Sequence, residues 1–219
     1  MGTITRNFAN NLTTSGLLKS TAFNNDSFDN ITSVPSGSVQ SGDIKFISSA
    51  TASSSASIEF TSGIDSTYKE YIFHFVNIHP GTDAVYFQMN FSTDGGSSYN
   101  VAKTTTFTTA YQQENDTEGN VVTQGDQDLA QSTAFKSITN QIGNDNDQSG
   151  SGYLHLFNPS STTYVKNFVS EMSVDEYRSF LHVARCAGYG NTTSAINAVK
   201  FQMSSGNIDN GQILLFGVN

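Results

Sequence analysis

The sequence predicts an all-β protein, an antiparallel β-sandwich of jelly-roll-like form with an extended N-terminal arm. Three observations lead to this prediction. Short segments such as residues 85–91 alternate between apolar and polar side chains, which is the period of a half-buried strand. Turn signals rich in Gly, Asn and Asp separate these segments, and hardly any segment has the spacing of a helix. Many short strands of this kind are typical of sandwiches and jelly rolls.

The first 42 residues differ in character from the rest of the chain. Asn, Ser and Thr dominate them, and their isolated large hydrophobes follow neither the period of a strand nor that of a helix. Such a segment buries too little surface to fold alone, but it has more large apolar side chains than a solvated linker. We therefore expect an anchoring arm over residues 1–42 and a sandwich domain over residues 43–219. The arm would lie against its own sandwich, a sister subunit or a neighbouring protein; a loose tail is the alternative. The candidate anchor residues are Phe8, Leu12, Leu17, Leu18, Phe23 and Phe28.

The centre of the sandwich is predicted to be a unit over residues 68–101. Residues 71–78 are apolar on both faces, which predicts a strand in the middle of a sheet with cover above and below. Residues 85–91 form the alternating strand. After them, Asp94-Gly95-Gly96 favours the positive φ angles of a tight hairpin. We expect these elements to make a three-stranded antiparallel unit.

The remaining strands are predicted from similar patterns. They lie at residues 44–47, 58–60, 103–111, 135–142, 153–157, 164–170, 199–203 and 212–218. Residues 171–185 fit both helical and strand spacing, and we favour a strand at 180–184. The polar segment 114–128 is predicted to be an exposed functional loop. Asn210-Gly211 is a strong hairpin signal.

The charge and the cysteine content exclude several kinds of site. The net charge of -9, with 10 Lys and Arg against 19 Asp and Glu, argues against nucleic acid as a partner. The single cysteine, Cys186, excludes an intramolecular disulfide and a cysteine-based zinc site, and we interpret it as a buried small hydrophobe. Only 13% of residues are charged, so uncharged polar side chains supply the surface. Such a surface suits close contact with proteins or sugars, although solubility alone explains it equally well.

The sequence has no signal pattern at its N-terminus and no apolar run of the roughly 18 residues that a membrane helix needs. We therefore expect synthesis in a cytoplasm and no membrane insertion.

Clusters of reactive side chains are not evident. The histidines, which are His74, His79, His155 and His182, are scattered, and neither a metalloprotease motif nor a nucleophile elbow occurs. A pair of glycosidase carboxylates cannot be identified. We therefore predict that the protein is not an enzyme and needs no cofactor.

One segment is a weak candidate for calcium. Asp145, Asp147 and Ser149 alternate before Gly150 as in the first half of a calcium loop. The bidentate Glu expected six residues after the glycine is replaced by Leu156. Because Asn and Asp also favour turns, we predict no metal site and keep this segment as the only candidate.

Several turns and strands carry a likeness to a known group. They are residues 3–16, 60–68, 71–73 (Tyr71-Ile72-Phe73), 92–96 (Ser92-Thr93-Asp94-Gly95-Gly96), 154–159 (Leu154-His155-Leu156-Phe157-Asn158-Pro159), 205–208 and 215–218. In these segments the chain resembles small virion proteins of marine tailed bacteriophages, which are described as structural or tail-fibre-like. The resemblance spans nearly the whole chain but includes no catalytic motif. It implies a β-sandwich on the particle surface, anchored by an N-terminal arm.

We therefore expect a non-enzymatic structural protein of a virion surface, made in the host cytoplasm. It would be a capsid decoration (cement) protein or a fibre, anchored by its arm to other virion proteins of the capsid or tail. A homotrimer is expected because association around an axis protects sheet edges and buries the hydrophobes of the arm.

The alternative is a carbohydrate-binding receptor-recognition module of a tail fibre. Tyr99, Tyr111 and Tyr189 would then stack on the sugar rings of a host glycan. A polysaccharide depolymerase is a third hypothesis.

Overall fold

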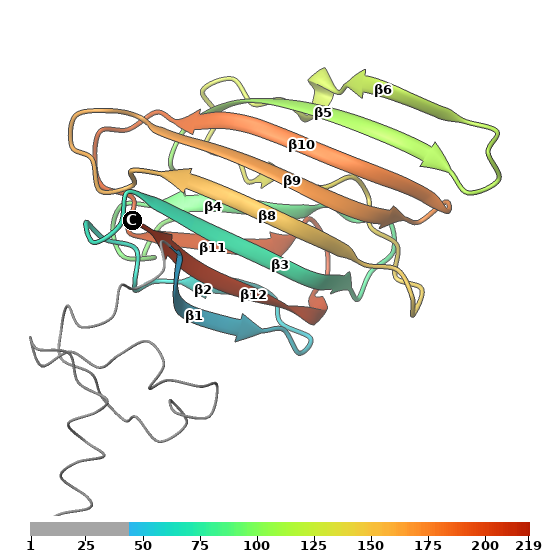
Figure 1. Cartoon of the computed structure of the whole chain (residues 1–219), viewed down its shortest axis with the longest axis horizontal. Helices are drawn as coiled ribbons and strands as arrows, with labels where there is room; N and C mark the ends of the chain where they lie inside the picture. The colour runs from blue at the N-terminus through green and yellow to red at the C-terminus, as the bar shows by residue number, and fades with distance from the viewer. Residues whose placement is uncertain (1–43) are drawn as a thin grey trace, which may run out of the picture. The chain divides into compact units, whose positions relative to one another are not determined.

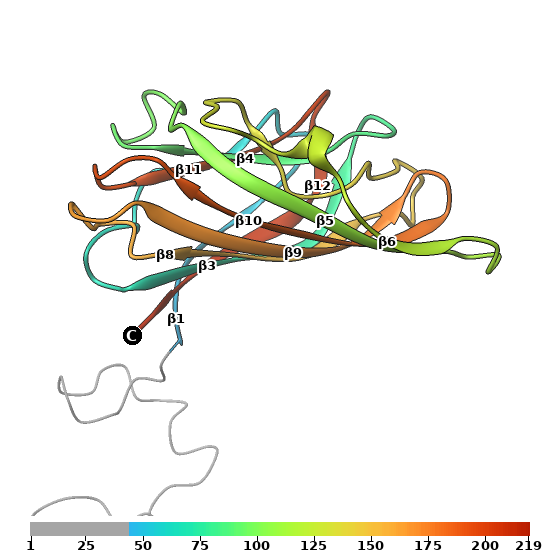
Figure 2. The same cartoon turned by 90° about the horizontal axis from the view of Figure 1, so that it is seen from above.

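The computed structural model describes residues 44–219, in which two antiparallel sheets are stacked (Figures 1 and 2). The strands are β1 (Ile44–Thr51), β2 (Ile58–Phe60), β3 (Glu70–Pro80), β4 (Phe87–Ser92), β5 (Lys103–Gln113), β6 (Gly119–Thr123), β7 (Lys136–Ser137), β8 (Gly150–Phe157), β9 (Lys166–Glu176), β10 (Phe180–Gly190), β11 (Ala198–Met203) and β12 (Ile208–Val218). A short 3-10 helix, Gly125–Gln127, follows β6. Within this part of the chain, no helix is long and apolar enough to cross a membrane.

Outside two hairpins, most strands that follow one another in the chain lie in opposite sheets. The large sheet has the order β1-β12-β3-β8-β9-β10-β5-β6, and the small sheet has the order β2-β11-β4-β7. Along the chain, β1, β3, β8 and β12 belong to the large sheet, whereas β2, β4, β7 and β11 belong to the small one. The antiparallel β-sandwich predicted from the sequence is confirmed.

Two hairpins interrupt this alternation. The hairpin β5–β6 lies between β4 and β7 in the chain, and the hairpin β9–β10 lies between β8 and β11. They pair with each other through β5 and β10, and β9 joins them to β8. Together they add four neighbouring strands to the large sheet. Figure 2 shows that β6 and the end of β5 reach beyond β4 and β11 of the small sheet.

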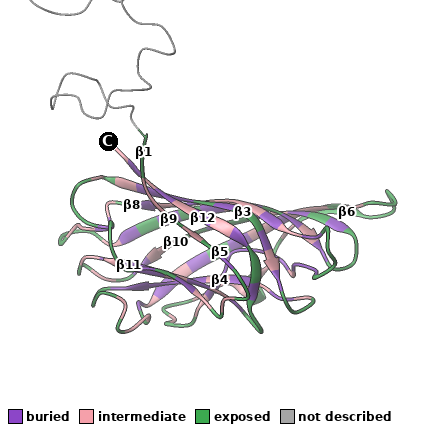
Figure 3. Cartoon of the chain, turned by 90° about the horizontal axis from the view of Figure 1, so that it is seen from below, coloured by how far each residue is buried: buried purple, intermediate pink, exposed green. Residues whose placement is uncertain are grey.

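The inward-facing side chains of both sheets form one hydrophobic core. Its centre is Phe201 of β11, whose ring centroid lies 5.2 Å from those of Phe73 and Phe75 and 5.7 Å from that of Phe87. Large buried rings of this kind contribute much of the burial energy of a core. Figure 3 shows the contrast between the buried segments within the two layers and the exposed β6 hairpin.

The predicted strand at residues 85–91 has the expected burial. Val85, Phe87, Met89 and Phe91 are all buried, as the alternation predicts. The predicted three-stranded unit, however, is wrong. Strand β3 lies in the large sheet between β12 and β8, whereas β4 lies in the small sheet between β11 and β7. Gly95 and Gly96 do have positive φ angles, but their turn carries the chain from the small sheet to the large one.

Asn210-Gly211 does not form a hairpin turn, contrary to the prediction. Both residues lie inside β12, where the register with β3 shifts between Asn210 and Gln212. Gly211 has a φ of +119°, and a Cβ at this position would lie only 2.6 Å from the carbonyl oxygen of Asn77. The glycine therefore allows a bulge in which two strands approach closely.

Two further segments differ from the prediction. Residues 114–128 are not a simple loop, because they contain β6 and the 3-10 helix. The ambiguous residues 171–185 are strand on both sides of a turn at 177–179, as favoured, so that β9 and β10 form a long hairpin. Pairing with β5 stabilises this hairpin as extended structure.

Three lysines are fully buried, which is rare for this residue type. Lys103 Nζ donates to Asn90 Oδ1 at 2.5 Å and to the Val101 carbonyl oxygen at 2.8 Å. The Nζ atoms of Lys136 and Lys166 also donate hydrogen bonds to backbone carbonyl oxygens. Burial lowers the pKa of Lys103 to about 7. A neutral amine has two N–H groups, so the two acceptors satisfy both of them.

Candidate functional site

A row of largely apolar side chains crosses the outer face of the large sheet, perpendicular to its strands. The registers align them in the order Phe46, Phe216, Ile72, His155 and Val169. Phe46 is 55% exposed and Val169 is 40% exposed. We call this row, together with its neighbours His74, Tyr153 and Phe157, the outer patch.

The rings of the outer patch contact one another. The centroid of Phe216 lies 5.7 Å from that of Phe46 and 5.4 Å from that of His74. The centroids of Tyr153 and His155 are 5.0 Å apart. The prediction that residues 71–78 are covered on both faces is not met within residues 44–219, because His74 and Val76 are exposed there. An exposed apolar row of this kind is a candidate interaction surface.

Two carboxylates border the outer patch, and each contacts a basic side chain. Glu171 accepts a hydrogen bond from Arg185 Nε at 2.5 Å, and Glu70 contacts His155 Nδ1. The outer patch itself contains no Asp, Glu, Lys or Arg side chain, although the whole chain carries -9. Contact between two such surfaces meets little repulsion.

A second candidate site is the hairpin pocket, which lies where the inserted hairpins extend the large sheet. The hairpins supply Tyr111, Glu118, Glu176, Arg178, Phe180 and His182 to its lining, and residues 86, 140 and 141 supply the opposite wall. Its volume is about 260 Å³. Ligand sites in proteins are typically pockets of roughly 300–1,000 Å³, so this pocket matches a small ligand.

A buried carboxylate and a partly exposed arginine meet in the hairpin pocket. Glu176 is 1% exposed, and its carboxylate accepts hydrogen bonds from Nε and Nη2 of Arg178 and from the Arg178 backbone N–H. These bonds raise the pKa of Arg178. The guanidinium also lies 5.3 Å from the centre of the Phe180 ring. The two charges therefore neutralise each other at the wall of the pocket.

His182 is the least satisfied polar residue of the hairpin pocket. It is 5% exposed, and its ring stacks on Tyr111 with a centroid distance of 5.5 Å and an interplanar angle of 18°. Neither ring nitrogen has a hydrogen-bond partner among the described residues. Burial lowers the pKa of His182, so the imidazole is neutral at pH 7. A buried polar group left without partners costs about 1–3 kcal/mol, so its presence calls for an explanation.

Further polar groups surround this histidine. Asn140 accepts a hydrogen bond from Thr109 Oγ1 at 2.9 Å, which fixes its amide at the edge of the hairpin pocket. Gln141 Nε2 donates to the carbonyl oxygen of Ala84 at 3.2 Å. Burial, followed by the charge of Asp126, raises the pKa of Tyr86, which keeps its hydroxyl protonated and able to donate.

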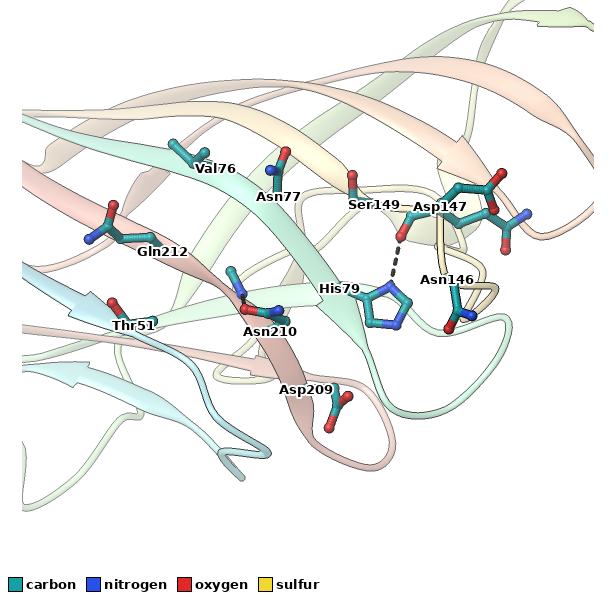
Figure 4. A pocket seen from close by; sticks show the side chains of 12 residues that line it. Thr51, Val76, Asn77, His79, Asn146, Asp147, Ser149, Asp209, Asn210 and Gln212 are labelled. Atoms are coloured by element: carbon teal, nitrogen blue, oxygen red, sulfur yellow. Dashed lines mark hydrogen bonds between the residues drawn. The ribbon is translucent and has the colours of Figure 1, made fainter.

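A third feature is an open groove of about 760 Å³, which lies where β3 ends and β12 begins (Figure 4). Its walls carry mainly amide and carboxylate side chains, and Figure 4 shows Asp209 and Asn210 on the side opposite Asn146 and Asp147. His79 lies between these sides, with Nδ1 2.7 Å from the carbonyl oxygen of Gln148. Most polar side chains of this groove are exposed, and none of its buried side-chain groups is without a hydrogen-bond partner among the described residues.

The three tyrosines predicted to contact a glycan lie in different places. Tyr111 lines the hairpin pocket. The hydroxyl of Tyr99 donates to Glu59 Oε2 at 3.0 Å, and that of Tyr189 accepts from Gln131 Nε2 at 3.3 Å. The structure therefore does not bring them together in one site.

The calcium candidate forms a turn. The carbonyl oxygen of Asp145 accepts from the Gln148 N–H at 2.9 Å, and the side chains of Asp145 and Asp147 are exposed, while Ser149 is half-buried. In the part of the chain that the structure describes, no three His, Cys, Asp or Glu side chains gather as metal ligands. The predicted anchor residues Phe8, Leu12, Leu17, Leu18, Phe23 and Phe28 lie outside the described residues.

The interpretation of Cys186 as a buried hydrophobe is confirmed, since it is 2% exposed. Burial raises the pKa of its thiol to about 12, and Arg185 points to Glu171 on the outer face instead of activating it.

Comparisons with protein-family models, with curated proteins and with solved structures give no match. The likeness to phage virion proteins therefore stays a prediction.

Proposed function

We propose that this protein is a non-enzymatic structural protein on the surface of a tailed-phage virion, a capsid decoration or fibre protein. Two features support this proposal besides the sequence resemblance. The alternation of β1, β2, β3, β4 and of β7, β8, β11, β12 between the sheets fits a jelly roll, an architecture common in viral capsid proteins. The outer patch provides a surface for assembly.

The outer patch is the observation that carries the proposal. Its occupant is a second copy of the chain, in a homotrimer. The patch is aromatic and apolar at its centre and contains no Asp, Glu, Lys or Arg side chain, so neighbouring copies can meet there without burying such a charge. Its burial would also give β3 and β8 the second cover that their apolar sequences favour.

Replacing Phe46 and Val169 together by serine is expected to convert the trimer into a monomer. Both side chains are exposed in the described chain, so the change removes interface contacts without opening the core. Sedimentation velocity at micromolar concentration measures the oligomer. Val121→Ser is the matched control, because Val121 is 68% exposed on β6, away from the outer patch. A monomeric wild type, or a double variant that remains a trimer, contradicts the proposal.

Deletion of residues 1–42 is expected to leave the sandwich folded but to abolish its incorporation into particles. Residues 44–219 form a hydrophobic core from their own side chains, so the melting temperature should change by less than a few degrees. Particles assembled with the truncated protein are purified and probed for it. Incorporation at the wild-type level would exclude the arm as the anchor.

Carbohydrate binding is the second candidate function. The observation that favours it is the hairpin pocket, where Tyr111 and Phe180 adjoin several polar side chains. Rings next to hydrogen-bonding groups suit sugars, which have both C–H faces and hydroxyls. A glycan array with the full chain tests this function directly.

A further inference from the structure

We propose that the hairpin pocket binds one ring of a neutral saccharide, with His182 as its buried hydrogen-bonding group and Tyr111 as its aromatic wall. This inference rests on the second candidate function and adds to it a site, a ligand class and a role for each residue. Three properties of the pocket support it: an unsatisfied imidazole, a balance of charge, and a mixed polar and aromatic lining.

The imidazole of His182 lacks a hydrogen-bond partner that can both donate and accept. A neutral imidazole has one N–H donor and one acceptor nitrogen, and in the described chain neither is used. A sugar hydroxyl can both donate and accept a hydrogen bond, so one hydroxyl can serve whichever imidazole nitrogen faces the pocket. Tyr111 stacks on the imidazole and is half-buried, so a ligand that reaches His182 must displace the ring of this tyrosine. A hydrogen bond from His182 to a bound hydroxyl would offset part of the free-energy cost of burying its nitrogens without partners.

The charges of the hairpin pocket favour a neutral ligand. Glu176 and Arg178 neutralise each other through their paired hydrogen bonds. The remaining charged side chain of the lining, Glu118, is exposed and negative, and it repels phosphate, sulfate and carboxylate groups. Glu176 offers no free carboxylate to a cationic ligand because Arg178 holds it, and Glu118 is exposed to solvent, which weakens its attraction for a cation.

The other lining groups match the two surfaces of a sugar. Tyr111 is half-buried and packs edge-to-face with Phe180, so its partly open ring supplies an apolar surface for C–H groups. Asn140, Gln141 and the Tyr86 hydroxyl lie on the opposite wall, where they can bond to outward hydroxyls. The volume of about 260 Å³ limits the enclosed part of the ligand to a small unit, so further sugars of a chain would lie outside.

The test uses the full-length protein and a panel of neutral sugars: glucose, galactose, mannose, N-acetylglucosamine and their disaccharides. Saturation-transfer NMR identifies binding, and titration gives the affinity. We expect saturable binding of at least one sugar by the wild type. His182→Phe and Tyr111→Ala should each weaken it by at least about tenfold. Tyr189→Ala is the control, because this tyrosine lies outside the pocket. The affinity of this variant for the sugar should match that of the wild type.

The His182→Phe variant also separates binding from folding. Phenylalanine keeps a flat ring but removes both unsatisfied nitrogens, so the melting temperature should stay the same or rise while affinity falls. Saccharide binding that survives both pocket variants would overturn this inference and leave the second candidate function in place. Absence of binding to every sugar in the panel would overturn this inference, and absence of any signal on the wider glycan array would overturn the second function as well.

Discussion

Replacing Phe201 by alanine is expected to lower the free energy of unfolding by about 3–5 kcal/mol. Phe201 is fully buried and contacts the rings of Phe73, Phe75 and Phe87. Its removal therefore exposes no polar group but leaves a cavity at the point where both sheets meet. Urea unfolding followed by circular dichroism, with linear extrapolation to water, measures the loss.

Tyr164→Ala is the control for this variant. Tyr164 is 70% exposed, so its truncation should change the free energy of unfolding by no more than about 0.5 kcal/mol. A loss below about 1 kcal/mol for Phe201→Ala would mean that the small sheet does not pack on the large one as described.

The wild-type protein is expected to gain stability as pH rises from 7 to 9, by about 2 kcal/mol. The main cause is Lys103, whose pKa is lowered by burial to about 7 from an ordinary value of 10.5. Burial also lowers the pKa of Lys136 and of Lys166, which act in the same direction. Between the two pKa values of Lys103 the unfolded chain holds a proton that the folded chain has released, so raising the pH favours the folded state. Below pH 7 both states are protonated, and the full cost of burying the charge remains. The window ends at pH 9 because the Cys186 thiol, with its pKa raised to about 12, opposes the trend at higher pH.

Lys103→Met tests the origin of this trend. Methionine has a similar length and no charge, so the gain between pH 7 and 9 should shrink by roughly 2 kcal/mol. The absolute stability of the variant is a separate quantity, because Asn90 Oδ1 and the Val101 carbonyl oxygen lose their donor. Lys45→Met, at an exposed lysine, serves as the control. Urea unfolding at each pH gives the comparison, and an unchanged pH trend in Lys103→Met would assign it to other groups.

The sequence predicted which side chains of a strand are buried better than it predicted which strands pair with each other. The alternation of residues 85–91 correctly predicted which side chains are buried, because the two-residue period depends only on the strand itself. Which strand pairs with which depends on contacts distant in the chain. Adjacent segments β3 and β4 therefore looked like partners, although they belong to opposite sheets. Asn210-Gly211 failed for a related reason, since the same positive φ angle serves a turn or a bulge.

The candidate site was only partly predictable. Tyr111 was singled out as a loop aromatic, but Glu176, Arg178 and His182 were not. These residues come together only because β10 pairs with β5, a contact between segments about 70 residues apart, which no local pattern reveals. The buried lysines were missed because a lysine in an alternating strand is ordinarily assigned to the solvent face. Their burial depends on carbonyl oxygens supplied by neighbouring loops.

The two inserted hairpins separate the residues that line the pocket from the residues that pack around Phe201. The framework of eight strands, from β1 to β4 and β7, β8, β11 and β12, contains the aromatic rings clustered around Phe201. The two inserted hairpins, including their turns, supply most of the pocket wall. Substitutions at the tips of the hairpins therefore spare the cluster on which folding depends. A lineage of such proteins could diversify its binding preference by altering hairpin length and sequence while the framework is inherited unchanged.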